Sequence, residues 1–237
     1  MLGREPHHVV IMQPYFLPYR NYFGLIRRCD EFVFFDDVQF CRKWQQRNCV
    51  PDGRGGKEWL TVPVVSRRPL LQRICDVEML PDSQWRRQMV RRIRKLYSRH
   101  PNFNEVFPSL IEILLAGHQR LVDLNIALLQ WSAALMGLPE PRWHLSSEIH
   151  TTSRERNERL IEICSQLGAT HYVCGTAAQV YLQTELFAQA GVEVIWHEEQ
   201  YVPYPQLGNM KFDHFVSGLD LLMNNGSKSY EYLRPLV

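Results

Sequence analysis

The sequence predicts an α/β fold built on a mostly parallel sheet, and three observations support this prediction. Short apolar runs of strand length recur along the chain, and longer segments of helical period separate them. Glycine or proline closes most of these segments. Alternating strands and helices are typical of a parallel sheet with right-handed crossovers.

The N-terminal part of the chain predicts strand, loop, helix and strand in that order. The apolar run at 8–12 suits a strand, and Pro14 and Pro18 hold the residues after it in a non-helical loop. A helix is predicted over 21–28. A second buried strand is predicted over 31–35, where aromatic and β-branched residues precede two aspartates.

A turn and helices follow in the middle of the chain. The glycine-rich segment 51–57 is a predicted loop, 59–64 a third strand and 74–79 a short edge strand. A helical insertion is predicted over about 82–137. Its three helices begin after the N-cap residue Asp82 and occupy roughly 82–100, 107–115 and 118–136.

The C-terminal part returns to alternation. We predict helices over 154–167 and 177–190, and strands over 171–175 and 192–197. An amphipathic stretch at 212–223 predicts a helical tail. The expected architecture is therefore a Rossmann-like sheet with a helical insertion and a helical C-terminal tail, in a single domain over 1–237.

Composition excludes several classes of function. The chain is 45% hydrophobic and 22% charged, with a net charge of +2, so no polyanionic partner such as nucleic acid is expected. No apolar window is long enough to span a membrane, and the first residues lack a signal peptide, so we expect a cytoplasmic protein. The six cysteines form no metal-ligand pattern, and no metal or cofactor is predicted.

The carboxyl ends of the predicted strands carry the candidate site, because ligands bind at that edge of a parallel sheet. Gln13 can donate and accept hydrogen bonds there. Asp36 and Asp37 are candidate catalytic residues, as a general base or as ligands of sugar hydroxyls, and the alternative is a turn cap. A metal role for these carboxylates is a further alternative.

Two more side chains near strand ends are candidate catalytic residues. Cys174 lies just before a predicted helix, where the helix dipole could activate a thiol for an acyl-thioester intermediate. The alternative is a small residue beside a ligand, a position that Gly175 also suits. His197 is a candidate base, and the alternative is a structural histidine.

The N-terminal loop and the segment after the second strand predict substrate contacts. Tyr15 and Tyr22 are assigned to the site as stacking faces, and Phe23 to the core, because neighbouring helical residues cannot face one pocket. Arg47 and Asn48 follow a polar stretch, and an arginine fork can bind a phosphate. A solvated loop arginine is the alternative.

The helix at 82–100 carries seven basic residues against one acid. Arg87, Arg91 and Arg94 are the predicted docking residues for an acidic acyl or peptidyl carrier protein. The alternative is a solvated basic face. Nucleic acid is disfavoured because the helix lacks interleaved exposed aromatic residues.

Several motifs together resemble the WbqC-like protein family. They are QPYFLPYRNYF at 13–23, CDEFVFFDDVQF at 29–40, RN at 47–48, WLTVPV at 59–64, YVCGTAAQVYL at 172–182, YPQ at 204–206 and GLDLLMNNG at 218–226. The resemblance extends the substrate-binding set to Tyr181 and Gln206. Tyr19 and Asn21 depart from the family pattern, which usually has Trp and Gly there.

The resemblance implies an enzyme of polysaccharide or secondary-metabolite biosynthesis. We expect an acyl- or aminoacyltransferase that forms an amide on an amino sugar or nucleotide-linked amino sugar, with a carrier-protein thioester as a candidate donor. A non-catalytic sugar-nucleotide or carrier-binding module is the alternative. A nucleotidylyltransferase-like enzyme is a third hypothesis, against which the loop lacks the histidines that such enzymes use.

Overall fold

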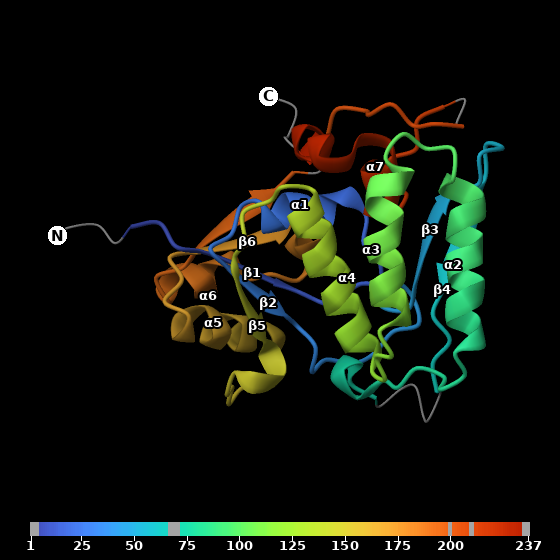
Figure 1. Cartoon of the computed structure of the whole chain (residues 1–237). Helices are drawn as coiled ribbons and strands as arrows, with labels where there is room; N and C mark the ends of the chain where they lie inside the picture. The colour runs from blue at the N-terminus through green and yellow to red at the C-terminus, as the bar shows by residue number, and fades with distance from the viewer. Residues whose placement is uncertain (1–4, 66–71, 199–200, 209–210, 234–237) are drawn as a thin grey trace.

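The computed structural model describes residues 5–65, 72–198, 201–208 and 211–233 (Figure 1). Five parallel strands form the main sheet in the order β5-β2-β1-β6-β7. Their bounds are β1 His8–Met12, β2 Glu31–Phe34, β5 Arg142–Leu145, β6 His171–Gly175 and β7 Glu193–His197. The predicted α/β class with a mostly parallel sheet is confirmed, and its Rossmann-like character stays a prediction.

Helices cover both faces of this sheet, and their bounds are α1 Arg20–Ile26, α2 Gln84–Tyr97, α3 Phe103–Leu115, α4 Leu121–Leu135, α5 Arg156–Gln166, α6 Thr184–Gln189 and α7 Gly218–Asn225. Alternate side chains of β1 enter two different cores. Val10 packs in the core that includes α1 to α4 and α7. Val9 and Ile11 pack in the core that includes α5 and α6, which lie together in Figure 1.

Two strands form a separate antiparallel hairpin, β3 Arg47–Pro51 with β4 Lys57–Thr61. The third strand of the sequence prediction thus lies outside the main sheet. The physical reason is the short turn, in which Gly53 and Gly55 have φ of 70° and 89° and Asp52 Oδ1 accepts from two backbone N–H groups at 2.8 Å. A turn this short connects antiparallel strands only, because parallel strands need a long crossover.

Three further boundaries differ from the sequence prediction. The expected edge strand at 74–79 is a 3-10 helix at Ile74–Asp76 followed by isolated bridges. The expected helix at 177–190 is divided into a 3-10 helix, Thr176–Val180, and α6. Strands β3 and β5 were not predicted. For β5 the reason is that Arg142–Leu145 (RWHL) is a half-exposed edge strand that lacks an apolar run.

The division before α6 has a tertiary cause. Asn157 of α5 donates to the Tyr181 carbonyl at 3.3 Å and accepts from the Gln183 backbone N–H at 3.0 Å. These hydrogen bonds replace helical ones at the connection, and they hold Tyr181 at the carboxyl edge of the sheet.

The helical insertion contains α2, α3 and α4, which form a layer beside the sheet and the hairpin (Figure 1). The predicted helical tail is present as α7, which begins at Gly218 rather than at residue 212 and is followed by a 3-10 helix at Gly226–Leu233. Within the described part of the chain, no helix combines the length and the apolar character that crossing a membrane requires.

Candidate functional site

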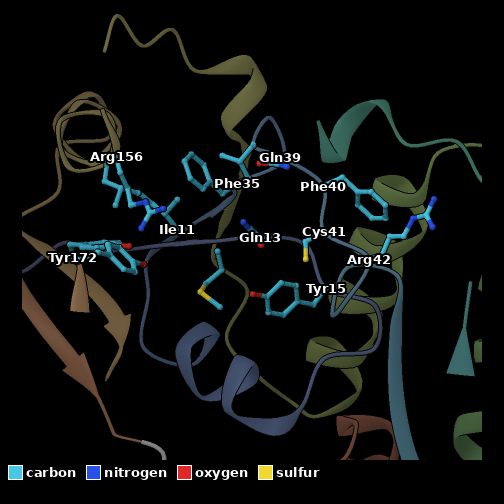
Figure 2. Close-up of a pocket in the computed structure, with 14 residues that line it drawn as sticks. Ile11, Gln13, Tyr15, Phe35, Gln39, Phe40, Cys41, Arg42, Arg156 and Tyr172 are labelled. Carbon is cyan, nitrogen blue, oxygen red and sulfur yellow. The ribbon is translucent and has the colours of Figure 1, made fainter. Parts of the chain in front are cut away.

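A cavity of about 710 Å³ lies at the carboxyl edge of the main sheet (Figure 2). Its walls come from the ends of β1 and β2, the segment 38–42, β6, α5 and Tyr181. The order of the strands reverses here, since β1 has β2 on one side and β6 on the other. Both this position and this volume are typical of small-molecule sites in parallel sheets.

Gln13 lies at the centre of the cavity, as Figure 2 shows, and its orientation is set by a buried amide. Its Oε1 accepts from Gln45 Nε2 at 2.7 Å, and Gln45 is only 3% exposed. Asn125 in turn donates to the carbonyls of Pro14 and Gln45 at 2.9 and 2.7 Å. The Nε2 of Gln13 is therefore left as a hydrogen-bond donor toward a ligand.

Tyr15 and Cys41 line the cavity on one side of Gln13 (Figure 2). Burial, and then the neighbouring Tyr19 and Tyr181, raise the pKa of Tyr15 to about 12. Tyr15 therefore keeps its hydroxyl proton near neutral pH and can donate or accept a hydrogen bond. Cys41 is the exposed cysteine among the six in the chain.

Arg156 and Tyr181 line the cavity from the side of α5 and β6. The guanidinium carbon of Arg156 lies 4.4 Å from the centroid of the Tyr181 ring. This cation–π contact keeps the planar group against the ring and leaves its edge open to an anion.

Asp36 and Asp37 are at the predicted edge but do not line the cavity. Asp36 is 1% exposed and accepts hydrogen bonds from the Ser147 N–H and Oγ at 2.9 and 2.8 Å. Asp37 forms an ion pair with Arg159 and accepts from Ser146. Both carboxylates thus connect the end of β2 to the turn after β5, and Asp37 also connects it to α5.

Cys174 also does not line the cavity. It is 3% exposed in the core with α5 and α6, and burial raises the pKa of its thiol to about 12. The environment is that of a protonated core thiol, which is a poor nucleophile.

His197 is fully buried at the end of β7, away from the cavity lining. Its Nε2 lies 2.6 Å from the Tyr201 hydroxyl, which donates to Asn21 Oδ1 at 2.7 Å. Burial, and then Arg28, lower the pKa of His197 to about 4. A neutral imidazole in this hydrogen-bond chain joins β7 to α1. Asn21, a departure from the family pattern, belongs to the same chain.

Of the eight predicted substrate-binding residues, Gln13, Tyr15 and Tyr181 line the cavity. Tyr22 lies in the core beneath it, where its hydroxyl donates to the Gln13 carbonyl at 2.8 Å. Gly175 is paired with β7 at the end of β6. Tyr22 therefore supports a residue of the cavity from the core, whereas Gly175 has a place in the sheet.

The other three lie elsewhere. Arg47 is on the hairpin, with its guanidinium carbon 4.0 Å from the Trp59 ring centroid. Asn48 is buried and donates to the Leu17 carbonyl at 2.7 Å. Gln206 donates to the buried carboxylate of Asp220 at 2.8 Å.

The predicted docking residues Arg87, Arg91 and Arg94 are exposed on α2. Arg94 lies over the Phe107 ring, with 5.2 Å from the guanidinium carbon to the centroid. Arg87, Arg91 and Lys95 stand four residues apart on one side of the helix and have no acidic partner among the described residues. We call these three residues the α2 ridge.

Sequence reasoning missed Arg156 and Cys41 as cavity residues. A signal for Arg156 existed, because a helix that follows a parallel strand begins at the carboxyl edge, so its first-turn side chains lie near the site. Without β5, the start of α5 could not be placed at that edge. Across the described segments, no three histidine, cysteine or acidic side chains are arranged to hold a metal ion.

Comparisons with known proteins give one family and one relative. The model of the WbqC-like protein family matches residues 13–232. The chain is 32% identical over 229 residues to the "Uncharacterized protein Rv1507c" of Mycobacterium tuberculosis (strain ATCC 25618 / H37Rv). The matched region covers 95% of this chain and 97% of the relative. No solved structure matches.

Proposed function

Because the chain belongs to the WbqC-like protein family, we propose that it is an acyl- or aminoacyltransferase that forms an amide on a nucleotide-linked amino sugar. The observation that supports this most is the cavity, where the oriented amide of Gln13, the Tyr15 hydroxyl and a guanidinium face one volume. A flat polar ligand with an anionic group fits these partners.

The proposed reaction is a direct transfer. The amine nitrogen of the sugar attacks the thioester carbonyl, the new C–N bond forms, and the C–S bond breaks. The thiolate leaves and takes the proton that the amine loses. Gln13 Nε2 donates to the carbonyl oxygen as negative charge develops there, which is how side-chain amides stabilise such transition states.

The proposed donor is a thioester on an acidic acyl or peptidyl carrier protein. The α2 ridge supports a docking role, because like charges four residues apart destabilise an isolated helix by a few tenths of a kcal/mol and an acidic partner relieves this repulsion. We expect Arg87→Glu with Arg91→Glu to raise KM for the carrier at least about tenfold while KM for the sugar is unchanged. Arg154→Glu, an exposed arginine outside the ridge, is the matched control.

The direct test is incubation of the protein with an aminoacylated carrier protein and dTDP-linked amino sugars, with mass spectrometry for the amide. Product that depends on all three components supports the proposal. Absence of product over a broad panel of donors and sugars would sink it. Release of pyrophosphate from a nucleotide would instead identify a nucleotidylyl transfer.

Cysteine variants separate direct from covalent transfer. Cys174→Ser is expected to keep full turnover, because its thiol is buried and protonated. Cys41→Ser is the informative comparison, since Cys41 lines the cavity. A mass shift of the acyl group on the wild-type chain that either Cys41→Ser or Cys174→Ser abolishes would contradict the direct route.

A second candidate is a non-catalytic module that binds the sugar nucleotide within a biosynthetic assembly. It is favoured by one observation: among the described residues that line the cavity, none is an aspartate, glutamate or histidine. This candidate predicts that the ligand raises Tm by mass action while no product forms.

A further inference from the structure

Arg156 is a cation on the cavity wall, and no compensating acid for it lies among the described residues. It is exposed and lines the cavity, and within the described segments its contact is the Tyr181 ring rather than a carboxylate. Arg159, one turn further along α5, is ion-paired with Asp37. Of the two arginines that α5 directs to this edge, one is therefore neutralised and the other is available to a ligand.

The backbone that carries the ring beneath Arg156 is held by Asn157. Asn157 is 3% exposed, and its amide donates to the Tyr181 carbonyl and accepts from the Gln183 N–H at 3.3 and 3.0 Å. The guanidinium stacked on this ring can donate two parallel hydrogen bonds from its planar edge to an anion. Figure 2 shows Arg156 beside Tyr172 and Ile11, across the cavity from Tyr15 and Cys41.

We propose that Arg156, stacked on Tyr181, binds the phosphate groups of a nucleotide-linked substrate. The described cavity lining contains Arg156 and no acidic side chain, so its charge favours an anion over a neutral sugar. The phosphates lie at the α5 side, and the sugar amine then lies toward Gln13 and Cys41. This inference rests on the proposed function, since it assigns the two ends of its substrate.

The test is calorimetric titration with inorganic pyrophosphate, dTDP, thymidine and glucosamine. Wild-type protein is expected to bind dTDP and pyrophosphate. Arg156→Gln is expected to weaken both at least about tenfold and to leave thymidine unchanged. Arg154→Gln, two residues earlier and exposed, is the control and is expected to bind as wild type. Arg156→Lys restores the charge without the fork and is expected to recover part of the affinity.

Several outcomes overturn the inference. They are absence of pyrophosphate and dTDP binding to the wild type, equal affinity in Arg156→Gln, or an equal loss for thymidine and dTDP. An equal loss in Arg154→Gln would show only a general effect of surface charge and would also overturn it.

The binding and activity measurements distinguish failure of the phosphate site from failure of the proposed transferase function. Phosphate binding that depends on Arg156, with no amide product from any donor, supports the phosphate site and contradicts the transferase. Amide formation at wild-type KM for the sugar nucleotide in Arg156→Gln contradicts the phosphate site and supports the transferase.

Discussion

Gln13 is held in its orientation by Gln45 and Asn125, which do not line the cavity themselves. Gln45 Nε2 engages its Oε1, and Asn125 holds the backbone carbonyls of Pro14 and Gln45. Gln45 Oε1 and Asn125 Oδ1 are buried without a hydrogen-bond partner among the described residues. These unpaired acceptors cost stability, and the arrangement therefore favours orientation of Gln13 over stability.

Gln45→Met tests this positioning role. The substitution removes the donor to Gln13 and also the unpaired Oε1, so we expect the free energy of unfolding to change by less than about 1 kcal/mol. Affinity for the sugar nucleotide is expected to fall about five- to tenfold because the Gln13 amide loses its fixed orientation. Calorimetric titration and urea unfolding measure the two effects. Gln88→Met on the exposed side of α2 is the control, and equal affinity in the two variants would contradict the role.

His197 makes the fold sensitive to acid. Its pKa of about 4 lies below its ordinary value of 6.5, so between these pH values the unfolded chain binds a proton that the folded chain does not. Stability from this group is therefore present above pH 6.5 and is lost as the pH falls toward 4.

We expect His197→Gln to reduce the acid sensitivity of folding. The wild type should lose about 3 kcal/mol more than the variant between pH 7 and pH 4, because the variant has no imidazole to protonate. Urea unfolding at a series of pH values measures this. His150→Gln, at an exposed position, should keep the wild-type slope, and parallel curves for wild type and His197→Gln would refute the assignment.

At the scale of elements, α1 packs closely against His197 at the end of β7, and the residue of α1 at this contact is Gly24. A Cβ on Gly24 would overlap the Tyr201 hydroxyl and would lie 2.7 Å from His197 Nε2. Alanine is the better helix former by about 1 kcal/mol. The overlap is with a hydroxyl already engaged by two partners, so the steric effect outweighs the helix propensity.

Gly24→Ala is expected to destabilise the fold by about 2 kcal/mol, measured by urea unfolding. In a Tyr201→Phe background, which removes the overlap with the hydroxyl and leaves the one with His197 Nε2, the same substitution should cost less than it does in the wild type. Additive effects of the two substitutions would show that helix α1 does not depend on this close approach.

At the scale of the whole molecule, three distant segments meet at one carbonyl. The backbone oxygen of Leu17 accepts from Asn48 Nδ2 and from Ser217 Oγ, both at 2.7 Å. Leu17 has φ of 42°, a conformation that leucine rarely adopts, and the two donors stabilise it. The N-terminal loop, the hairpin and the segment before α7 are thereby joined.

Asn48→Ala is expected to destabilise the fold by about 2 to 3 kcal/mol, because it also leaves the Cys49 N–H without the Oδ1 that it donates to at 2.8 Å. Thermal unfolding measures the loss. Arg47→Ala is the neighbouring control, and we expect a smaller loss because Arg47 contributes mainly a contact with Trp59. A larger loss for Arg47→Ala would contradict the structural role of Asn48.

The sequence by itself determined the parallel sheet, the helical insertion and the edge where the cavity lies. Apolar runs such as 8–12 and 171–175 are local signals, and they place Gln13 and Tyr15 without knowledge of their neighbours. Only the tertiary structure decided the roles of the polar side chains. Asp36 meets Ser146 at a separation of 110 residues and Asp37 meets Arg159 at 122. Partners this distant leave no local pattern, so the sequence leaves both a catalytic role and a turn cap open for these two carboxylates. The structure shows them in hydrogen bonds and an ion pair that join the end of β2 to distant parts of the chain.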